Sequence, residues 1–308
     1  MKKGWKHLLW CMAVAVFALL VSTVSVFAAA SVKTYHWAGD PAIKVGGAWF
    51  RSDYVRDEET YEFLSTKIER STTSSKKGFK TVIEGDGLKD GFATDGKTLY
   101  YIQSNVFMSL NLKNAKTTVI KKLKPAKETY YEFHGYFDGK IWLICRKEKY
   151  GVPLLCSYNP KTKKFKTEKK NFLCFNPAAA SRYLLISEGR TELKKAADAT
   201  YKLKVYDKKT GKATLLAKKA YPWGYASGGG DYSSMGKWVA YVEYNKTKKV
   251  WQIKEYKFKN KKTYVLKTMK KGQRPSIMWL GDGVRYALSK TAKDGTAIVT
   301  EEGGLKAK

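Results

Sequence analysis

The stretch Asp95-Gly96-Lys97-Thr98-Leu99-Tyr100-Tyr101 is the clearest fold signal in the chain, because it joins a tight turn directly to a strand. Asp-Gly is a strong signal for a hairpin turn, and the aromatic and β-branched residues after it are typical of strands. Close copies begin at Asp138-Gly139, Met235-Gly236 and Asp282-Gly283, and weaker copies at Gly46-Gly47 and Ala180-Ser181. The chain therefore carries a recurring unit that consists of a turn and an apolar strand.

The spacing of these units predicts the architecture. The turns centre on positions 47, 96, 139, 181, 236 and 283, which gives spacings of 49, 43, 42, 55 and 47 residues. A period in the forties with several strands per unit is typical of propeller blades. No sustained helical period occurs after the N-terminal apolar run, so we predict an all-β chain that forms a six-bladed β-propeller.

The ends of the repeated region predict how the ring closes. The last unit supplies strands near 276–280, 284–289 and 296–300 and has no outer strand. An unassigned strand candidate, Val32–Trp37, precedes the first unit. We expect this N-terminal strand to close the last blade, because pairing the two would cover two exposed sheet edges.

Two short motifs resemble those of a known family. The Asp-Gly-Lys turns at Asp95, Asp138 and, in degenerate form, Asp282 resemble the turns of the TolB-like group of six-bladed propellers, as does Tyr206-Asp-Lys-Lys-Thr-Gly-Lys212. The likeness covers most of residues 32–303, whereas regular Trp-Asp endings and kelch double-glycine blocks are missing. The resemblance implies a propeller fold with a binding or scaffolding role, and it supplies no catalytic residues.

Residues 1–30 have the layout of a signal peptide. Lys2, Lys3 and Lys6 precede an apolar run over 8–27, and Ala28-Ala29-Ala30 forms a small-residue cleavage site. We predict cleavage there, which leaves 31–308 as one propeller domain that is secreted or associated with the cell envelope. An uncleaved membrane anchor is the alternative, because about 20 apolar residues span a bilayer.

The net charge points to anionic partners. The chain carries +32, and removal of the three signal-peptide lysines leaves +29. Such an excess favours association with anionic cell-wall polymers, glycans or membrane surfaces. Export directs the protein away from nucleic acid, so we do not expect nucleic acid as a partner, and we expect a monomer.

Lysines gather in equivalent hairpins of successive units, which makes these hairpins candidate polyanion-binding sites. In a propeller they would form a basic ring or arc near the outer rim, with binding that weakens in salt. The structural alternative is that lysines in solvated turns protect edge strands from pairing. The candidates are Lys113, Lys116, Lys161, Lys163, Lys164, Lys208, Lys209, Lys212, Lys259, Lys261 and Lys262.

A second candidate combines aromatic rings with a Gly-rich run. We interpret this segment as a connection between blades near the central opening, where rings could hold a sugar or peptide. The alternative is an inner strand packed in the core and followed by an ordinary loop. The candidate ligand-binding residues are Tyr221, Trp223, Tyr225, Asp231 and Tyr232.

Motifs for catalysis are missing from the chain. After the signal segment only His36 and His134 remain as histidines, and there is no Gly-x-Ser-x-Gly elbow, His-Glu-x-x-His motif or P-loop. We therefore predict a non-catalytic binding protein with no cofactor and no metal site. The alternatives are a secreted glycan-active enzyme, whose paired carboxylates would lie at the central opening, and a membrane-tethered interaction domain.

Two cysteines flank one predicted hairpin. Cys145 and Cys156 could face each other across it, and whether they pair stays open at this stage. The simpler interpretation is that both are small buried apolar residues.

Overall fold

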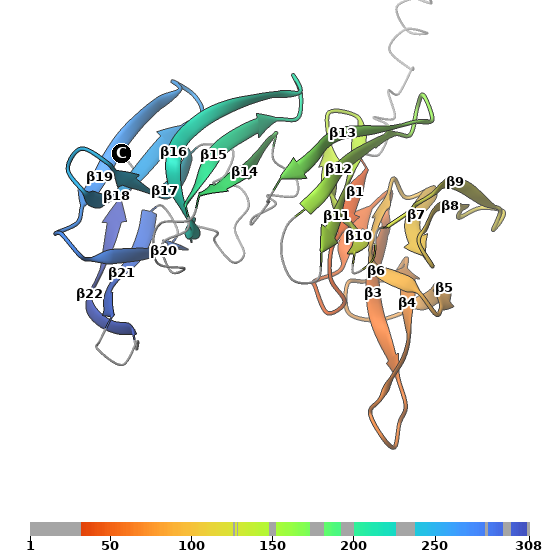
Figure 1. Ribbon diagram of the computed structural model, residues 1–308. Coiled ribbons are helices and arrows are strands. Elements are labelled where there is room, and N and C mark those ends of the chain that lie inside the picture. The colour runs from red at the N-terminus through yellow and green to blue at the C-terminus, as the bar shows by residue number, and fades with distance from the viewer. Residues whose placement is uncertain are drawn as a thin grey trace, which may run out of the picture.

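The computed structural model describes residues 32–125, 127, 129–147, 152–172, 182–191, 200–225, 238–280, 283–291 and 297–306. Every regular element in these ranges is a β-strand, and the strands form five antiparallel sheets (Figure 1). The all-β prediction is confirmed. Within the same ranges no helix has the length and apolarity that a bilayer span requires.

The five sheets follow one another along the chain. The first contains β2 (Ile43–Val45), β3 (Ala48–Arg56), β4 (Phe63–Ser71) and β5 (Lys80–Gly85). The second contains β1 (Lys33–Tyr35), β6 (Leu88–Thr94), β7 (Thr98–Gln103), β8 (Val106–Asn111) and β9 (Thr117–Lys122). The third contains β10 (Thr129–Phe137), β11 (Lys140–Lys147), β12 (Val152–Asn159) and β13 (Lys164–Phe172).

The fourth sheet is the largest, with six strands. It contains β14 (Tyr183–Thr191), β15 (Thr200–Asp207), β16 (Lys212–Tyr225), β17 (Trp238–Asn245), β18 (Val250–Lys257) and β19 (Lys262–Thr268). The fifth contains β20 (Arg274–Leu280), β21 (Gly283–Thr291) and β22 (Ala297–Lys306). Each recurring unit of the sequence supplies one of the strands β3, β7, β11, β14, β17 and β21.

The recurring strands of the inner units, β7, β11, β14 and β17, are buried on both faces, whereas β3 and β21 of the two end sheets are buried mainly on one face. Along β7, Leu99 and Tyr101 pack into a core shared with the first sheet, whereas Tyr100 and Ile102 pack into a core shared with the third. Successive side chains of a strand point to opposite faces, so one apolar run fills two interfaces. The sheets therefore stack face to face in the manner of propeller blades.

The same alternation links the rest of the chain. On β11, Trp142 and Ile144 join Leu184 and Ile186 of β14 in a core between the third and fourth sheets. Five hydrophobic clusters connect successive units, and none of the five joins the fifth sheet to the first. In Figure 1 the strands β20–β22 lie at the opposite end of the molecule from β3 and β4. The described sheets form an open series and not a closed ring.

The predicted closure by the N-terminal strand is wrong. The strand β1 pairs with β6, with Lys33 opposite Thr94 and Tyr35 opposite Phe92. The Tyr35 ring stacks on the Phe92 ring with centroids 5.0 Å apart. Tyr35 is also buried in the core between the first and second sheets, which holds β1 on the second sheet. The strand β22 ends a three-stranded sheet.

The prediction of six separate blades is also corrected. The 14-residue strand β16 pairs with β15 on one side and with β17 on the other. Ala220 lies opposite Tyr201 in one pairing and opposite Glu243 in the other, and it is fully buried. The fourth and fifth units thus share one sheet, because the chain continues as a strand where a loop was expected.

The turn that defines the repeat also forms a contact between sheets. Gly96 has a φ of +84°, and a Cβ added to it would lie 3.0 Å from the Gly46 Cα and 3.1 Å from the Val45 carbonyl oxygen. These distances are tighter than nine in ten contacts of real Cβ atoms, so glycine suits both the positive φ and the close approach. The hairpins of the first and second sheets therefore touch through their backbones.

Gly96 has both a positive φ and a close backbone contact, and alanine replacements at two glycines should separate the two effects. Gly139→Ala is the matched control, because Gly139 has a φ of +73° with no heavy atom within 4 Å of its added Cβ. We expect the control to lose about 1–2 kcal/mol of unfolding free energy from backbone strain. Gly96→Ala should lose at least about 1 kcal/mol more, because the methyl group also overpacks the contact. Urea unfolding measures both, and equal losses would contradict the contact.

Candidate polyanion-binding surface

Three of the lysine-rich hairpins share one turn geometry. Asn111, Asn159 and Asp207 end strands β8, β12 and β15, and each Oδ1 accepts a hydrogen bond of 2.9 Å from the backbone N–H two residues later. Such a side chain replaces a backbone turn, which is the reason for Asp and Asn at these positions. The fourth residue after each has a positive φ, namely Ala115, Lys163 and Gly211.

The hairpin between β18 and β19 is a variant of this turn. Lys261 has a φ of +55°, and Asn260 Oδ1 accepts a 3.0 Å hydrogen bond from the Lys262 N–H. A further hairpin between β17 and β18 begins at Asn245 and has a positive φ at Lys249. Its exposed lysines were not among the predicted sites, although Asn-Lys-Thr-Lys-Lys closely matches Asn-Pro-Lys-Thr-Lys-Lys after β12.

Ten of the eleven candidate lysines are exposed. They are Lys113, Lys116, Lys161, Lys163, Lys164, Lys209, Lys212, Lys259, Lys261 and Lys262. Within the described part of the chain none of the ten forms an ion pair. We call these ten residues the lysine hairpins. Their charges face solvent without local neutralisation.

The one acid in these hairpins is already paired. Arg182 donates to both carboxylate oxygens of Asp207, at 2.8 and 2.5 Å. Partial burial acts to raise the pKa of Asp207, but the Arg182 hydrogen bonds and the Lys209 backbone N–H outweigh it and lower the pKa. Asp207 therefore stays ionised and does not offset the nearby lysines.

Lys208 departs from the predicted surface because it is buried. Its position, directly after the strand, faces the preceding recurring unit in other hairpins too, where Leu112 and Phe258 pack into hydrophobic clusters. The ammonium nitrogen of Lys208 lies 5.8 Å from the ring centroid of Phe137 and 5.6 Å from that of Trp142. A long alkyl stem with a cation over aromatic faces fits this place. Lys208 contributes to packing between the third and fourth sheets.

Two of the hairpins lie at the same ends of their sheets as the Gly turns. Strands alternate in direction within an antiparallel sheet, so the β8–β9 hairpin shares an end with residues 95–96, and the β12–β13 hairpin with residues 138–139. Exposed lysines continue along the outer strands, at Lys121 and Lys122 on β9 and Lys170 on β13. The basic surface therefore extends from the hairpins along the sheet edge.

The aromatic candidate site is only partly placed. Tyr221, Trp223 and Tyr225 belong to strand β16, so they do not lie on a loop, but their side chains are outside the described residues. Asp231 and Tyr232 also lie outside the described residues. A ligand site formed by these five residues stays a prediction.

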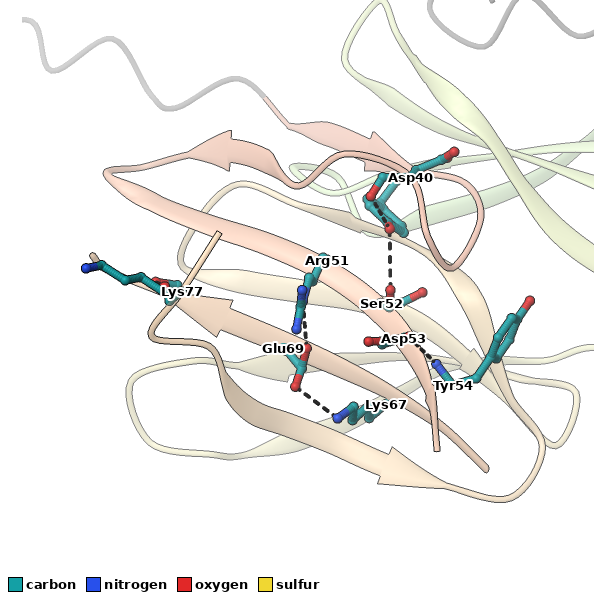
Figure 2. Close-up of polar contacts among 10 residues, drawn as sticks. Asp40, Arg51, Ser52, Asp53, Tyr54, Lys67, Glu69 and Lys77 are labelled. Carbon is teal, nitrogen blue, oxygen red and sulfur yellow. Dashed lines mark hydrogen bonds and ion pairs between the residues drawn. The ribbon is translucent and has the colours of Figure 1, made fainter. Parts of the chain in front are cut away.

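The charged side chains of the first sheet pair with one another, in contrast to the lysine hairpins. Glu69 is buried, and it receives Arg51 at 2.7 Å and Lys67 at 3.2 Å (Figure 2). On β6, Asp90 accepts hydrogen bonds from the Ala38 N–H and the Tyr54 hydroxyl. No group of three metal-ligating side chains occurs among the described residues.

Cys145 and Cys156 are free thiols in the core between the second and third sheets. Cys145 lies opposite Leu154 and Cys156 opposite Leu143, so the two cysteines are diagonal neighbours on β11 and β12. Burial raises the pKa of both thiols, that of Cys156 to about 11. The protonated thiols act as small apolar residues here.

Comparisons with known proteins find likeness among solved structures only. No protein-family model matches the chain, and no curated protein matches it. TolB from Acinetobacter baumannii is 12 % identical, with 88 % of this chain and 66 % of that chain covered and a TM-score of 0.35. An oligogalacturonate lyase from Vibrio parahaemolyticus is 10 % identical, with coverage of 83 % and 86 % and a TM-score of 0.36.

The β-propeller domain of the Trilobed protease from Pyrococcus furiosus is 10 % identical, with coverage of 90 % and 94 % and a TM-score of 0.39. Structures similar to this chain thus include TolB and other β-propeller proteins, in agreement with the TolB-like resemblance of its turns. At these TM-scores the likeness says nothing about activity, partners or location.

The buried position of Lys208 predicts different effects for two adjacent lysines. Lys208→Ala should lower the unfolding free energy by about 1–2 kcal/mol, because it removes the cation from the two rings. Lys209→Ala changes a solvated side chain and should stay within about 0.5 kcal/mol of the wild type. Thermal and urea unfolding of both variants test this, and equal stability of the two would refute the packing role.

Proposed function

We propose that this chain is an exported, non-catalytic binding protein of the β-propeller type that holds anionic polymers through its lysine hairpins. One observation supports the proposal above others. Ten exposed lysines stand in turns of defined geometry, and the one acid among them is engaged by Arg182. Residues 1–30, as a signal peptide, would deliver this surface to the cell envelope.

The chemistry of lysine suits a polymer better than a small ligand. A lysine ammonium is a compact, hydrated point charge on a flexible stem, so it attracts phosphate or carboxylate groups without fixing their orientation. Each exposed contact contributes little, but hairpins placed along successive sheets could contact many groups of one chain. Binding of this kind is broad in specificity and sensitive to salt.

The enzyme alternative has less support. A glycan-active site at a central opening requires sheets that close around it, whereas the described sheets form an open series. The lysine hairpins need no closed ring in order to act. We therefore favour binding over catalysis for this chain.

Charge removal at the hairpins should weaken binding more than the same removal elsewhere. The test variant changes Lys161, Lys163, Lys164, Lys209 and Lys212 to Gln. The control changes five lysines that are also exposed but lie outside the lysine-rich hairpins, namely Lys33, Lys44, Lys124, Lys202 and Lys270. With poly(glycerol phosphate) as the probe, we expect the test variant to lose roughly tenfold or more in affinity and the control much less. Wild-type binding should fall as salt rises from about 50 to about 300 mM.

Titration calorimetry measures all three proteins. Equal losses in the two variants would show that only the net charge matters, and salt-independent binding would rule out an electrostatic surface.

A further inference from the structure

The β3–β4 hairpin exposes a cluster of large apolar side chains. Tyr61 is 73 % exposed, Phe63 58 %, Leu64 50 % and Tyr54 38 %, and Trp37 from the segment after β1 is 50 % exposed. We call these five residues the aromatic tip. In Figure 1 the β3–β4 hairpin projects well beyond the other strands of the first sheet. Single exposed apolar residues are common, but a group of this kind marks an interaction site.

Two members of the aromatic tip contact each other, and a shared hydrogen-bond acceptor brings the segment of a third beside them. The Tyr54 and Phe63 rings meet edge to face with centroids 5.6 Å apart. Asp90 Oδ2 accepts hydrogen bonds from the Tyr54 hydroxyl at 3.1 Å and from the Ala38 N–H at 3.2 Å, which places the segment carrying Trp37 next to Tyr54. Figure 2 shows Tyr54 apart from the pair formed by Arg51 and Glu69. The tip is therefore one surface built from two segments.

The turn of this hairpin is fixed by its own hydrogen bonds. Asp57 Oδ1 accepts the N–H groups of Glu59 at 3.0 Å and Thr60 at 2.8 Å, and also the Thr60 hydroxyl. The Thr60 backbone hydrogen bond is the main reason that the pKa of Asp57 is lowered. Arg56 donates to the Tyr61 carbonyl oxygen at 3.0 Å. A surface ordered in advance loses less entropy when a partner binds.

The charge of the tip is opposite to that of the whole chain. Residues 53–62 contain Asp53, Asp57, Glu58, Glu59 and Glu62 against one base, Arg56, for a local net charge of −4, whereas the chain carries +32. The acids from 58 to 62 are exposed beside Tyr61. At physiological salt the field of a charge is screened over a distance of about 8 Å. Lysines elsewhere in the chain therefore act little on a partner near the tip, and the nearby carboxylates dominate its electrostatic interaction.

We propose that the aromatic tip is a docking surface for a basic polypeptide segment that also carries apolar side chains. Tyr, Trp and Phe are the side chains enriched at interfaces, where they supply most of the binding energy. Lysine or arginine of the partner pairs with the carboxylates at positions 58, 59 and 62 and stacks over the exposed rings. This surface is separate from the lysine hairpins and has the opposite charge.

Charge complementarity selects this occupant over two others. An anionic bilayer would be repelled by the carboxylates that surround the rings. Two tips from two copies of the chain would bring their acids together, which is also unfavourable. A cationic and apolar chain satisfies both the rings and the carboxylates.

The experiment uses the full chain and a fluorescein-labelled peptide of alternating lysine, leucine and serine. Tyr61→Ser with Phe63→Ser forms the test variant, and Val119→Ser with Val265→Ser is the control, because these valines are similarly exposed on β9 and β19. By fluorescence anisotropy we expect the test variant to lose roughly tenfold or more in affinity and the control to match the wild type. Unchanged thermal unfolding verifies that each variant is folded.

A second variant checks the carboxylates, because changes at the rings alone do not show the role of charge. Glu58→Gln, Glu59→Gln and Glu62→Gln together should weaken peptide binding and flatten its salt dependence. The hairpin variant with five glutamines should bind the peptide normally, so this proposal and the proposed polyanion site fail independently.

Several results would overturn the docking proposal. These are no binding of the basic peptide by the wild type, equal binding by the test variant, and equal tip-dependent binding of a peptide with glutamate in place of lysine. Tip-dependent binding to anionic vesicles or tip-dependent self-association would also overturn it, since the occupant would then be a membrane or a second copy.

Discussion

Burial of one strand on both of its faces is the constraint on which the rest of this structure depends. In the inner units the strand after the turn alternates between two cores, as Leu99 and Tyr101 do against Tyr100 and Ile102 on β7. Such a strand cannot be satisfied by a single sheet, so each inner sheet needs a neighbour on either side. The backbone contact between Gly46 and Gly96 then brings the turns of two sheets together at one end.

The departures from a regular propeller follow from local chain geometry. Packing of Tyr35 against Phe92 holds β1 beside β6, where it adds a fifth strand to the second sheet. Continuity of β16 through the buried Ala220 merges two repeats into one sheet. Both features leave the packing of adjacent sheets intact, because they change how strands are joined and not which faces are apolar.

Sequence periodicity predicted the recurring strands and the Asx-capped hairpins, because apolar alternation and turn chemistry are local properties. It did not predict the partner of β1, since several sheet edges offer the same hydrogen bonds. The choice among them depends on tertiary packing, here the stacking of Tyr35 with Phe92. It placed Lys208 on the surface, because the direction of a turn residue depends on the neighbouring sheet. The aromatic tip was missed since its residues come from separate segments.

Binding of an anionic polymer by the lysine hairpins can be measured directly by lysine footprinting with an amine-reactive reagent. Modification of each lysine is measured by mass spectrometry with and without poly(glycerol phosphate). We predict that the polymer protects the ten hairpin lysines, while Lys208 reacts slowly in both samples because it is buried. Protection spread evenly over all exposed lysines, or its absence at the hairpins, would contradict the account.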